Sequence, residues 1–305
     1  MGKIFITGGT GFIGRHVVQK LKKIEGVECW ILTRKSVPSD NDKIHYLKGD
    51  IHDAVSLKNF FIDICPDTLL HLAWHDSKKE YMISYDNYLY LDSSRNLVDL
   101  FLRSGGKNVI ASGTCAEYDW TKNDQHYENE PCSPSSVYGI CKMKLCNEII
   151  NLCKQYHARF VWGRVFFCYG PGEDSYKLLT TAYQTFRRGG RFSCEKPENC
   201  LDYVFVEDVA NYFVEFINNK EIDGIINIAT GKQIRVFDLV NMLVNKIGQG
   251  ELISSDSKEK VVVVGSTKEA QRFNLFCKYN IEMGIEKYIY GGIMNGDNSS
   301  LHTDI

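Results

Sequence analysis

The chain lacks any apolar run of the length that a membrane span needs, which is about 20 consecutive residues. It also lacks an excess of one charge, because 36 lysines and arginines stand against 38 aspartates and glutamates. We therefore expect neither a membrane nor nucleic acid as a partner, since both attract proteins with a surplus of positive charge. An apolar strand begins almost at the first residue, so we expect no signal peptide and predict a cytoplasmic protein.

No C-x-x-C pair occurs among the eleven cysteines. They are scattered, and several fall within expected helices and strands, so we predict reduced thiols rather than a disulfide framework. Of the eight histidines, only His71 and His75 stand close together, at the end of an expected strand rather than on one helical face. We therefore expect no metal site.

A glycine-rich turn lies near the start of the chain. Gly8, Gly11 and Gly14 follow a short apolar run, and Gly9 begins a tighter G-x-G-x-x-G spacing. One glycine allows a sharp turn, a second lets the backbone approach phosphates, and a third packs the following helix against the strand. The start of that helix presents unpaired N–H groups and a positive dipole end to an anion. The turn therefore predicts binding of a dinucleotide.

Strands and helices alternate through the first part of the chain. The expected strands are 4–7, 27–33, 44–47, 68–73, 108–112 and 160–167, and the expected helices are 12–23, 57–64, 87–102 and 137–154. This alternation predicts an α/β fold with a doubly wound parallel sheet (Rossmann-type) that binds ligands at the carboxyl ends of its strands.

The pattern loosens from about residue 170. Helices are expected at 178–187, 206–217 and 236–247, with short strands at 202–205, 225–228 and 261–264. A chain of 305 residues allows one large or two modest domains. We predict a dinucleotide-binding domain in residues 1–169, with chain crossings to the other lobe, a smaller α/β substrate-binding lobe mainly in 170–290, and a flexible tail in 291–305.

Tyr138 and Lys142 form a Tyr-x-x-x-Lys spacing at the start of an expected helix. One helical turn separates them, so both side chains share a face. An ammonium near a phenol favours the phenolate by charge attraction, which suits the pair to move a proton at a hydroxyl or carbonyl centre. The spacing alone is common and also fits a solvated lysine. Together with the glycine turn and a strand ending at Thr114, it predicts a catalytic pair.

With these motifs the chain resembles the extended short-chain dehydrogenases/reductases that act on nucleotide sugars. The shared motifs follow the family's order. They are TGGTGFIG at 7–14, GD at 49–50, HLA at 71–73, Asn87, SGTCAEY at 112–118, YGICK at 138–142, YGPG at 169–172 and DYVFVED at 202–208.

The resemblance implies a role for each matching residue. Tyr138 is the proton donor and acceptor, Lys142 holds the nicotinamide ribose, and Thr114 hydrogen-bonds the reacting oxygen. The expected cofactor-binding residues are Gly8, Thr10, Gly11, Phe12, Ile13, Thr33, Arg34, Asp50, Ile51, Leu72, Ala73, Asn87, Tyr138, Lys142 and Val165. The expected substrate-binding residues are Thr114, Phe167 and Arg191. The resemblance also implies a homodimer joined through the helices that begin near Asn87 and Tyr138.

Arg34 indicates the form of the cofactor. It follows Thr33 at the end of the second strand, where an NAD enzyme would place a carboxylate on the ribose diol. A guanidinium binds a 2′-phosphate through charge-assisted hydrogen bonds, so we predict NADP(H) rather than NAD(H). The other interpretation is a solvated charge that stacks on adenine without selecting.

The residues after Thr114 bear on the reaction. Cys115 and Ala116 occupy the places of the Asp-Glu pair that the family's 4,6-dehydratases use, so dehydration is not expected. Cys115 lies close to Thr114 and could be the second acid of an epimerase-reductase. We interpret it as a packing residue, because the resemblance places the family's acidic cysteine one residue further along, at Ala116. We predict reduction of an NDP-linked keto sugar, at C4 of an NDP-4-keto-6-deoxyhexose. The alternatives are a 4-epimerase with retained NAD, a reductase of a non-sugar ketone or aldehyde, and a non-catalytic dinucleotide-sensing protein.

The site for the substrate's diphosphate departs from the family. Leu201 stands where many members have an arginine, and Phe167 lies where they often have an asparagine. Arg191 is the first candidate for the missing cation, with Arg187, Arg188 and Arg272 as the others; each also fits a surface charge. The nucleotide base and the sugar stay open.

Overall fold

The computed structural model describes residues 2–35, 43–75 and 80–296. Its chain forms two compact units, which we describe separately. The first comprises Met1–Asp119, Glu128–Val165 and Val209–Ile228, and the second comprises Trp120–Tyr127, Phe166–Asp208 and Ala229–Ile305. The chain thus passes between the two units several times.

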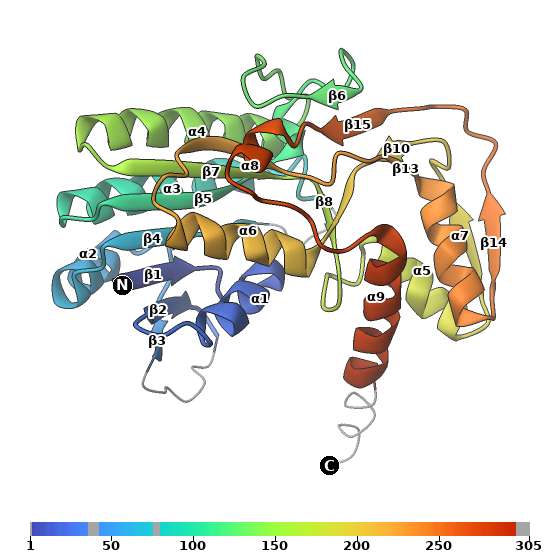
Figure 1. Ribbon diagram of the computed structural model, residues 1–305, viewed down its shortest axis with the longest axis horizontal. Coiled ribbons are helices and arrows are strands. Elements are labelled where there is room, and N and C mark those ends of the chain that lie inside the picture. Colours follow the sequence, from blue (N-terminus) through green and yellow to red (C-terminus); the bar gives the residue numbers. More distant parts are fainter. Residues whose placement is uncertain (1, 36–42, 76–79, 297–305) are drawn as a thin grey trace. The chain divides into compact units, whose positions relative to one another are not determined.

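Seven parallel strands form the sheet of the first unit, in the spatial order β12-β7-β5-β4-β1-β2-β3 (Figure 1). Their bounds are β1 Lys3–Thr7, β2 Glu28–Thr33, β3 Ile44–Lys48, β4 Thr68–His71, β5 Asn108–Thr114, β7 Arg159–Val165 and β12 Gly224–Ile228. The predicted doubly wound parallel sheet is confirmed.

Helices pack against both faces of this sheet. On one face, α2 (Ala54–Ile64), α3 (Asp86–Arg103) and α4 (Val137–Gln155) share a core with Phe5 and Trp162 of the strands. On the other face lie α1 (Phe12–Leu21) and α6 (Val206–Asn218), whose apolar side chains reach the glycines Gly9 and Gly163. Successive strand residues point to opposite faces, so strands buried on both sides are largely apolar.

The edge strand β12 corrects one prediction. The sequence assigned residues 225–228 to the C-terminal lobe, but β12 pairs with β7 in the main sheet. A parallel pair needs a long crossover, and the chain between β7 and β12 includes α6. The expected strand 160–167 also divides, because β7 ends at Val165 and β8 (Phe167–Tyr169) belongs to the second unit.

The chain order reverses between β1 and β4. The strands β2 and β3 lie on one side of β1, whereas β4, β5 and β7 follow on the other. A doubly wound sheet binds its ligands at such a switch point, in a crevice beyond the carboxyl ends of the strands. Thr7 and His71 are register partners at these two strand ends, so the switch point lies directly before the glycine turn.

The second unit contains a mixed four-stranded sheet, β13-β10-β15-β6, and two separate parallel pairs, β11-β8 and β14-β9. The bounds are β6 Gln125–His126, β9 Arg191–Cys194, β10 Cys200–Leu201, β11 Tyr203–Phe205, β13 Ile234–Arg235, β14 Glu251–Ser254, β15 Val262–Gly265, α5 Leu178–Arg187, α7 Val236–Ile247, α8 Lys268–Arg272 and α9 Ile281–Gly296.

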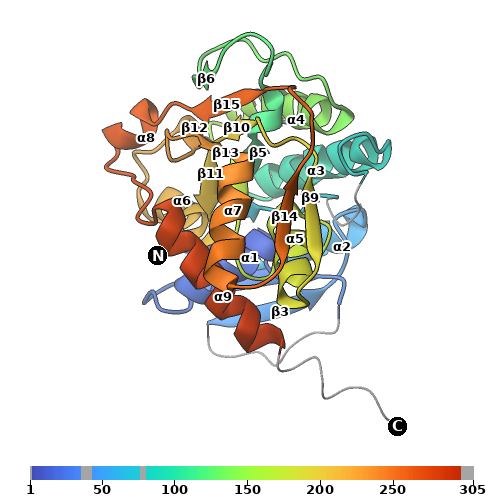
Figure 2. The same cartoon turned by 90° about the vertical axis from the view of Figure 1, so that its right-hand side faces the viewer.

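Three of these helices surround a separate apolar core. Leu179 and Phe186 of α5, Leu239 of α7 and Ile285 of α9 are buried together. Figure 2 shows α5 and α7 beside β9 and β14, and α9 beside α7. Helix α9 runs to Gly296, so the tail predicted from residue 291 begins inside a helix; residues 297–305 lie outside the described part of the chain.

Candidate active site

The glycine turn after β1 has the geometry that its spacing predicts. Gly8 adopts a φ of +72°, and a Cβ at this position would lie 2.6 Å from the Ala73 nitrogen at the end of β4. A Cβ at Gly14 would lie 2.0 Å from the Gly8 carbonyl oxygen. Larger residues at either position would therefore separate the turn from β4 or the helix from the turn.

This turn suits a diphosphate. Helix α1 begins after Gly11, and its first turn carries no acidic residue. Its N-terminal N–H groups and dipole thus meet no competing carboxylate there. Thr10, Phe12 and Ile13 are half-buried at the same helix start. These residues fit the phosphate-binding part of a dinucleotide site.

The ends of β2 and β3 bring two expected cofactor residues together. The Arg34 guanidinium lies 4.0 Å from an Asp50 carboxylate oxygen and donates to the Tyr90 hydroxyl at 3.5 Å. Arg34 is 67% exposed, so this ion pair is weak and the guanidinium stays accessible. Thr33 and Ile51 are buried beside them.

Asn87 differs from the other expected cofactor residues, because its side chain already has protein partners. Its amide oxygen accepts the Trp74 indole N–H at 2.8 Å. Its amide nitrogen donates to the carbonyl oxygens of Tyr81 and Ser84, both at 2.7 Å. The cofactor role of Asn87 stays a prediction, as do those of Leu72 and Ala73, which are half-buried after β4, and of Val165, which is buried at the end of β7.

The three expected catalytic residues come from α4 and β5. Ser136 caps α4 by accepting the Gly139 N–H at 3.0 Å, and Tyr138 and Lys142 follow in the first turns. The Lys142 side chain is 2% exposed, and its ammonium donates to the Ser112 carbonyl oxygen at 2.8 Å. Thr114 ends the same strand two residues later. The hydrogen bond therefore holds α4 against the strand that carries Thr114.

The Thr114 hydroxyl accepts one hydrogen bond from the backbone and keeps its own hydrogen for donation. Its oxygen accepts the Ala116 N–H at 3.2 Å, at the start of a 3-10 turn, η1 (Cys115–Glu117). One lone pair is thereby used, and the hydroxyl hydrogen can be donated to a substrate oxygen. Cys115 and Ala116 are buried in this turn.

His71 joins the two strands at the switch point. Its Nδ1 lies 2.7 Å from the Thr7 hydroxyl and its Nε2 lies 2.9 Å from the Ser94 hydroxyl of α3. Burial, helped by the charge of Lys142, lowers the pKa of His71 to about 3. The imidazole is therefore neutral and serves as a structural bridge.

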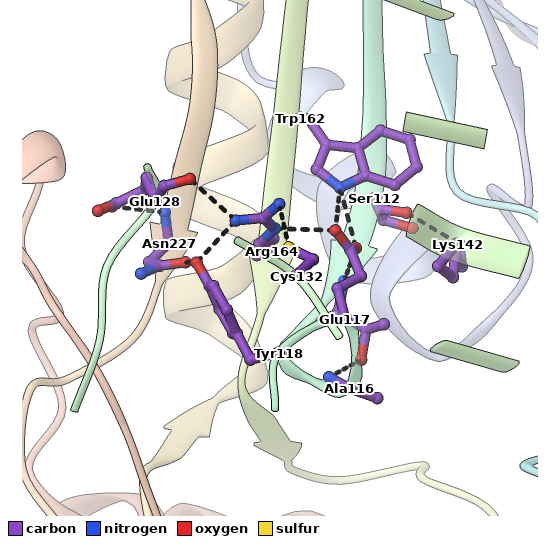
Figure 3. Close-up of polar contacts among 11 residues, drawn as sticks. Ser112, Ala116, Glu117, Tyr118, Glu128, Cys132, Lys142, Trp162, Arg164 and Asn227 are labelled. Atoms are coloured by element: carbon purple, nitrogen blue, oxygen red, sulfur yellow. Dashed lines mark hydrogen bonds and ion pairs between the residues drawn. The ribbon is translucent and has the colours of Figure 1, made fainter. Parts of the chain in front are cut away.

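Glu117 forms a buried ion pair with Arg164 (Figure 3). Its carboxylate accepts from the Thr114 backbone N–H at 2.9 Å, the Trp162 indole N–H at 3.0 Å and the Arg164 guanidinium at 2.8 Å. Glu117 is fully buried and Arg164 is 4% exposed. Although burial opposes the charged form, the Glu117 carboxylate raises the pKa of Arg164.

The rest of this network anchors Arg164 (Figure 3). The guanidinium also donates to the Tyr118 hydroxyl at 2.9 Å, the Glu128 carbonyl at 3.1 Å and the Cys132 sulfur at 3.0 Å. The Tyr118 hydroxyl in turn donates to the Asn227 amide oxygen on β12 at 2.7 Å. The network thus connects η1 to the edge of the sheet.

Glu117, Arg164 and Trp74 also belong to this region, although the sequence motifs gave them no role. Arg164 lies within the apolar run of β7, and a charged residue in a strand buried on both faces is the signal that could have identified it. Its partner could not be found in this way, because many carboxylates in the chain could meet it.

In the second unit, the expected substrate residues have local partners. The Phe167 ring centroid lies 5.7 Å from that of Trp120 and 5.8 Å from that of Tyr203. Arg191 is 73% exposed and forms an ion pair with Glu251 at 2.5 Å. Arg272 is likewise exposed and paired with Glu269. The substrate roles of Phe167 and Arg191 stay predictions.

Among residues 2–35, 43–75 and 80–296, no three His, Cys, Asp or Glu side chains gather in a way that could hold a metal ion. No disulfide joins the cysteines of this part of the chain. The helices found there are all too short or too polar to cross a membrane.

Residues 4–229 match the family model described as the NAD dependent epimerase/dehydratase family. The chain belongs to this family. The resemblance found in the sequence, and the prediction of an NAD(P)-dependent enzyme, are thereby confirmed.

Several relatives match most of the chain. A UDP-glucose 4-epimerase of Halalkalibacterium halodurans is 24% identical over 298 residues, which cover 88% of each protein. A dTDP-6-deoxy-L-talose 4-dehydrogenase (NAD(+)) of Aggregatibacter actinomycetemcomitans is 27% identical, over 75% of this chain and 84% of the relative. Among solved structures, MoeE5 in complex with UDP-glucuronic acid and NAD has a TM-score of 0.86 at 19% identity, covering 96% of this chain and all of MoeE5. This last likeness shows the fold alone.

The neutral His71 predicts a stability that depends on pH. The unfolded chain protonates this imidazole near its ordinary pKa of 6.5, whereas the folded chain resists protonation down to about 3. We therefore expect the free energy of unfolding to fall below pH 6.5, by about 1.4 kcal/mol per pH unit from His71 alone. Urea unfolding at about pH 7 and about pH 5 measures the slope. His71→Asn should reduce it, and the exposed control His157→Asn should not. Equal slopes in all three proteins would contradict the assignment.

Glu117→Gln should destabilise the protein by about 3–5 kcal/mol, because it leaves the buried Arg164 charge without its carboxylate. Glu251→Gln is the matched control. It removes the partner of Arg191 in an exposed pair and should cost about 0–1 kcal/mol. Urea denaturation of both variants measures the difference, and similar losses would mean that the buried pair is not special.

Proposed function

We propose that this protein is a reductase that transfers a hydride from NADPH to a keto carbon of a nucleotide-linked sugar, C4 of an NDP-4-keto-6-deoxyhexose. The observation that carries the proposal is which residues are present in the catalytic region and which are missing from it. Tyr138, Lys142 and Thr114 come from adjoining elements, while the buried residues after Thr114 are Cys115 and Ala116. Neither can act as the carboxylate acid and base that dehydration requires.

Each of the three residues has a task in such a reduction. A bound reduced nicotinamide supplies the hydride. The Thr114 hydroxyl donates a hydrogen bond to the carbonyl oxygen and stabilises the charge that develops there. Tyr138 gives its phenolic proton to the new alkoxide, and the Lys142 ammonium favours the resulting phenolate.

The relatives support a nucleotide sugar as the substrate. The dehydrogenase among them acts, by its name, at position 4 of a dTDP-linked 6-deoxy sugar. For the diphosphate we propose Arg191, which would have to exchange its exposed carboxylate partner for the phosphates. Leu201, where many family members have an arginine, is buried on β10.

A 4-epimerase is the second candidate, because the relative from Halalkalibacterium halodurans carries that name. Such an enzyme oxidises and then reduces the same carbon, so it retains its dinucleotide and shows no net oxidation. Reduction differs by consuming NADPH in proportion to product. Solvent deuterium at C3 or C5 of the product would indicate that epimerisation accompanies reduction.

We also propose that the protein forms a homodimer through α3 and α4. At the start of α3, Tyr85 is 81% exposed, Leu89 is 54% exposed and Tyr88 is 38% exposed. Exposed apolar side chains on one helix are typical of a surface that another copy covers. The cytoplasmic location stays a prediction.

The proposed reaction is tested with a panel of NDP-4-keto-6-deoxyhexoses. We expect loss of NADPH absorbance with at least one of them, and a product reduced at C4. Tyr138→Phe should lower kcat by about 10²–10⁴-fold, since it removes the proton donor. Dinucleotide that stays bound through purification, together with interconversion of two sugars without net absorbance change, would establish the epimerase instead.

The cofactor preference is tested at Arg34. MoeE5 binds NAD and the dehydrogenase is named for NAD(+), so NADH is the rival cofactor. Arg34→Ala should lower the affinity for NADPH by about 10–100-fold, because hydrogen bonds to charged groups contribute about 1.5–3 kcal/mol. NADH binding should change by less than about threefold. Arg103→Ala is the matched control, since Arg103 is similarly exposed and also pairs with an aspartate. Equal weakening of both dinucleotides in fluorescence titrations would mean that Arg34 does not select.

A further inference from the structure

Trp74 is a residue of the catalytic region to which the motifs give no role. It follows β4 by three residues, and its indole lies against Lys142, whose ammonium is 4.0 Å from the ring centroid. We propose that Trp74 is a positioning residue, which holds the Lys142 ammonium over its indole face and so sets the proton transfer by Tyr138. The proposal rests on the proposed function, because it concerns the same proton donor.

The ammonium needs such a neighbour because it is buried. Removing a charge from water is costly unless nearby groups compensate for the lost hydration. The contacts that compensate include the Ser112 carbonyl at 2.8 Å (Figure 3), the face of Trp74, and Trp162 at 5.9 Å from its ring centroid. An indole has the strongest negative face among the aromatic side chains, so Trp74 favours the charged form of the amine.

Trp74 is itself held in one orientation. Its indole nitrogen donates to Asn87, whose amide is bound to two carbonyl oxygens of the segment before α3. Asn87 is fully buried. This chain of hydrogen bonds fixes the plane of the indole, so its face can direct the ammonium.

The same indole lies beside the proton donor. The ring centroids of Trp74 and Tyr138 are 6.3 Å apart, in an edge-on arrangement. The ring centroids of Tyr81 and Tyr138 are 5.2 Å apart. The Tyr138 backbone N–H donates to the Met82 carbonyl oxygen at 3.0 Å. Trp74 therefore contacts both members of the catalytic pair and restricts the distance between them.

This arrangement separates the effect of the ring's shape from the effect of its negative face. Trp74→Phe keeps a smaller aromatic face, whereas Trp74→Leu removes it. Fluorinated tryptophans inserted at position 74 keep the shape and weaken the face step by step. If the face acts on Lys142, activity should follow its strength rather than its volume.

We expect Trp74→Leu to lower kcat by about thirtyfold at neutral pH, which corresponds to about 2 kcal/mol for a desolvated cation–π contact. Trp74→Phe should lose less than about threefold, and the KM of the sugar should change little. The inflection of the pH profile that reports Tyr138 should move to higher pH in Trp74→Leu, because a displaced ammonium stabilises the phenolate less. Trp30→Leu, which removes a half-buried indole elsewhere in the same unit, should leave the inflection unchanged.

The fluorinated series decides the matter if Trp74→Leu does not fold. A stepwise fall of kcat with increasing fluorination, at constant melting temperature, supports the proposal. A kcat that does not change with fluorination overturns the proposal. The same holds if Trp74→Leu keeps the wild-type pH inflection, or if Trp30→Leu shifts the inflection as Trp74→Leu does.

A measurement without sugar keeps this test apart from the test of the proposed function. The ionisation of Tyr138 is followed as phenolate difference absorbance with NADPH bound, using Tyr138→Phe as the blank. Ionisation at higher pH in the Trp74 variants supports the proposal even if no keto sugar is reduced. Ionisation at the wild-type pH overturns it, whichever substrate the enzyme uses.

Discussion

The hydrogen bond from the Lys142 ammonium to the Ser112 carbonyl is the contact on which the proposed catalytic arrangement depends. It joins α4, which carries Tyr138, to β5, which carries Thr114. A buried ammonium must keep such partners, because water cannot replace them. The position of Tyr138, the proposed proton donor, relative to Thr114 therefore depends on the requirement that the Lys142 charge keep its partner.

A second buried charge, the Glu117 carboxylate, is bound to the end of β5. The Glu117–Arg164 pair costs desolvation energy that an apolar pair would not, so stability alone does not account for it. Its carboxylate accepts the Thr114 N–H, and its guanidinium reaches toward the edge of the sheet through Tyr118. The end of β5 is therefore held at two points, by Lys142 at the Ser112 carbonyl and by Glu117 at the Thr114 N–H. A rigid strand end suits a group that must meet a developing charge without rearranging.

Local patterns were sufficient to predict much of the molecule. The glycine turn and the Tyr138–Lys142 spacing depend on geometry within a few residues, and the structure has the turn and the helix where the sequence placed them. The prediction of β12 in the second lobe was wrong, because pairing between residues 161–165 and 224–228 is a long-range choice that no local pattern encodes. The tail from residue 291 was misjudged for a different reason. Its polar composition resembles a loop, yet α9 continues through it to Gly296.

By itself, the sequence determined the glycine turn and the alternation of strands and helices that predicts a parallel sheet, and it predicted Tyr138 and Lys142 as a catalytic pair, since each of these patterns is local in the chain. Only the tertiary structure decided which side chains surround them. Trp74 after β4 meets Lys142 on α4, and Glu117 after β5 meets Arg164 on β7, because the fold brings together elements that are far apart in the chain. Because these charges are buried, they need the contacts that the fold provides, since a charge removed from water is costly without a compensating partner.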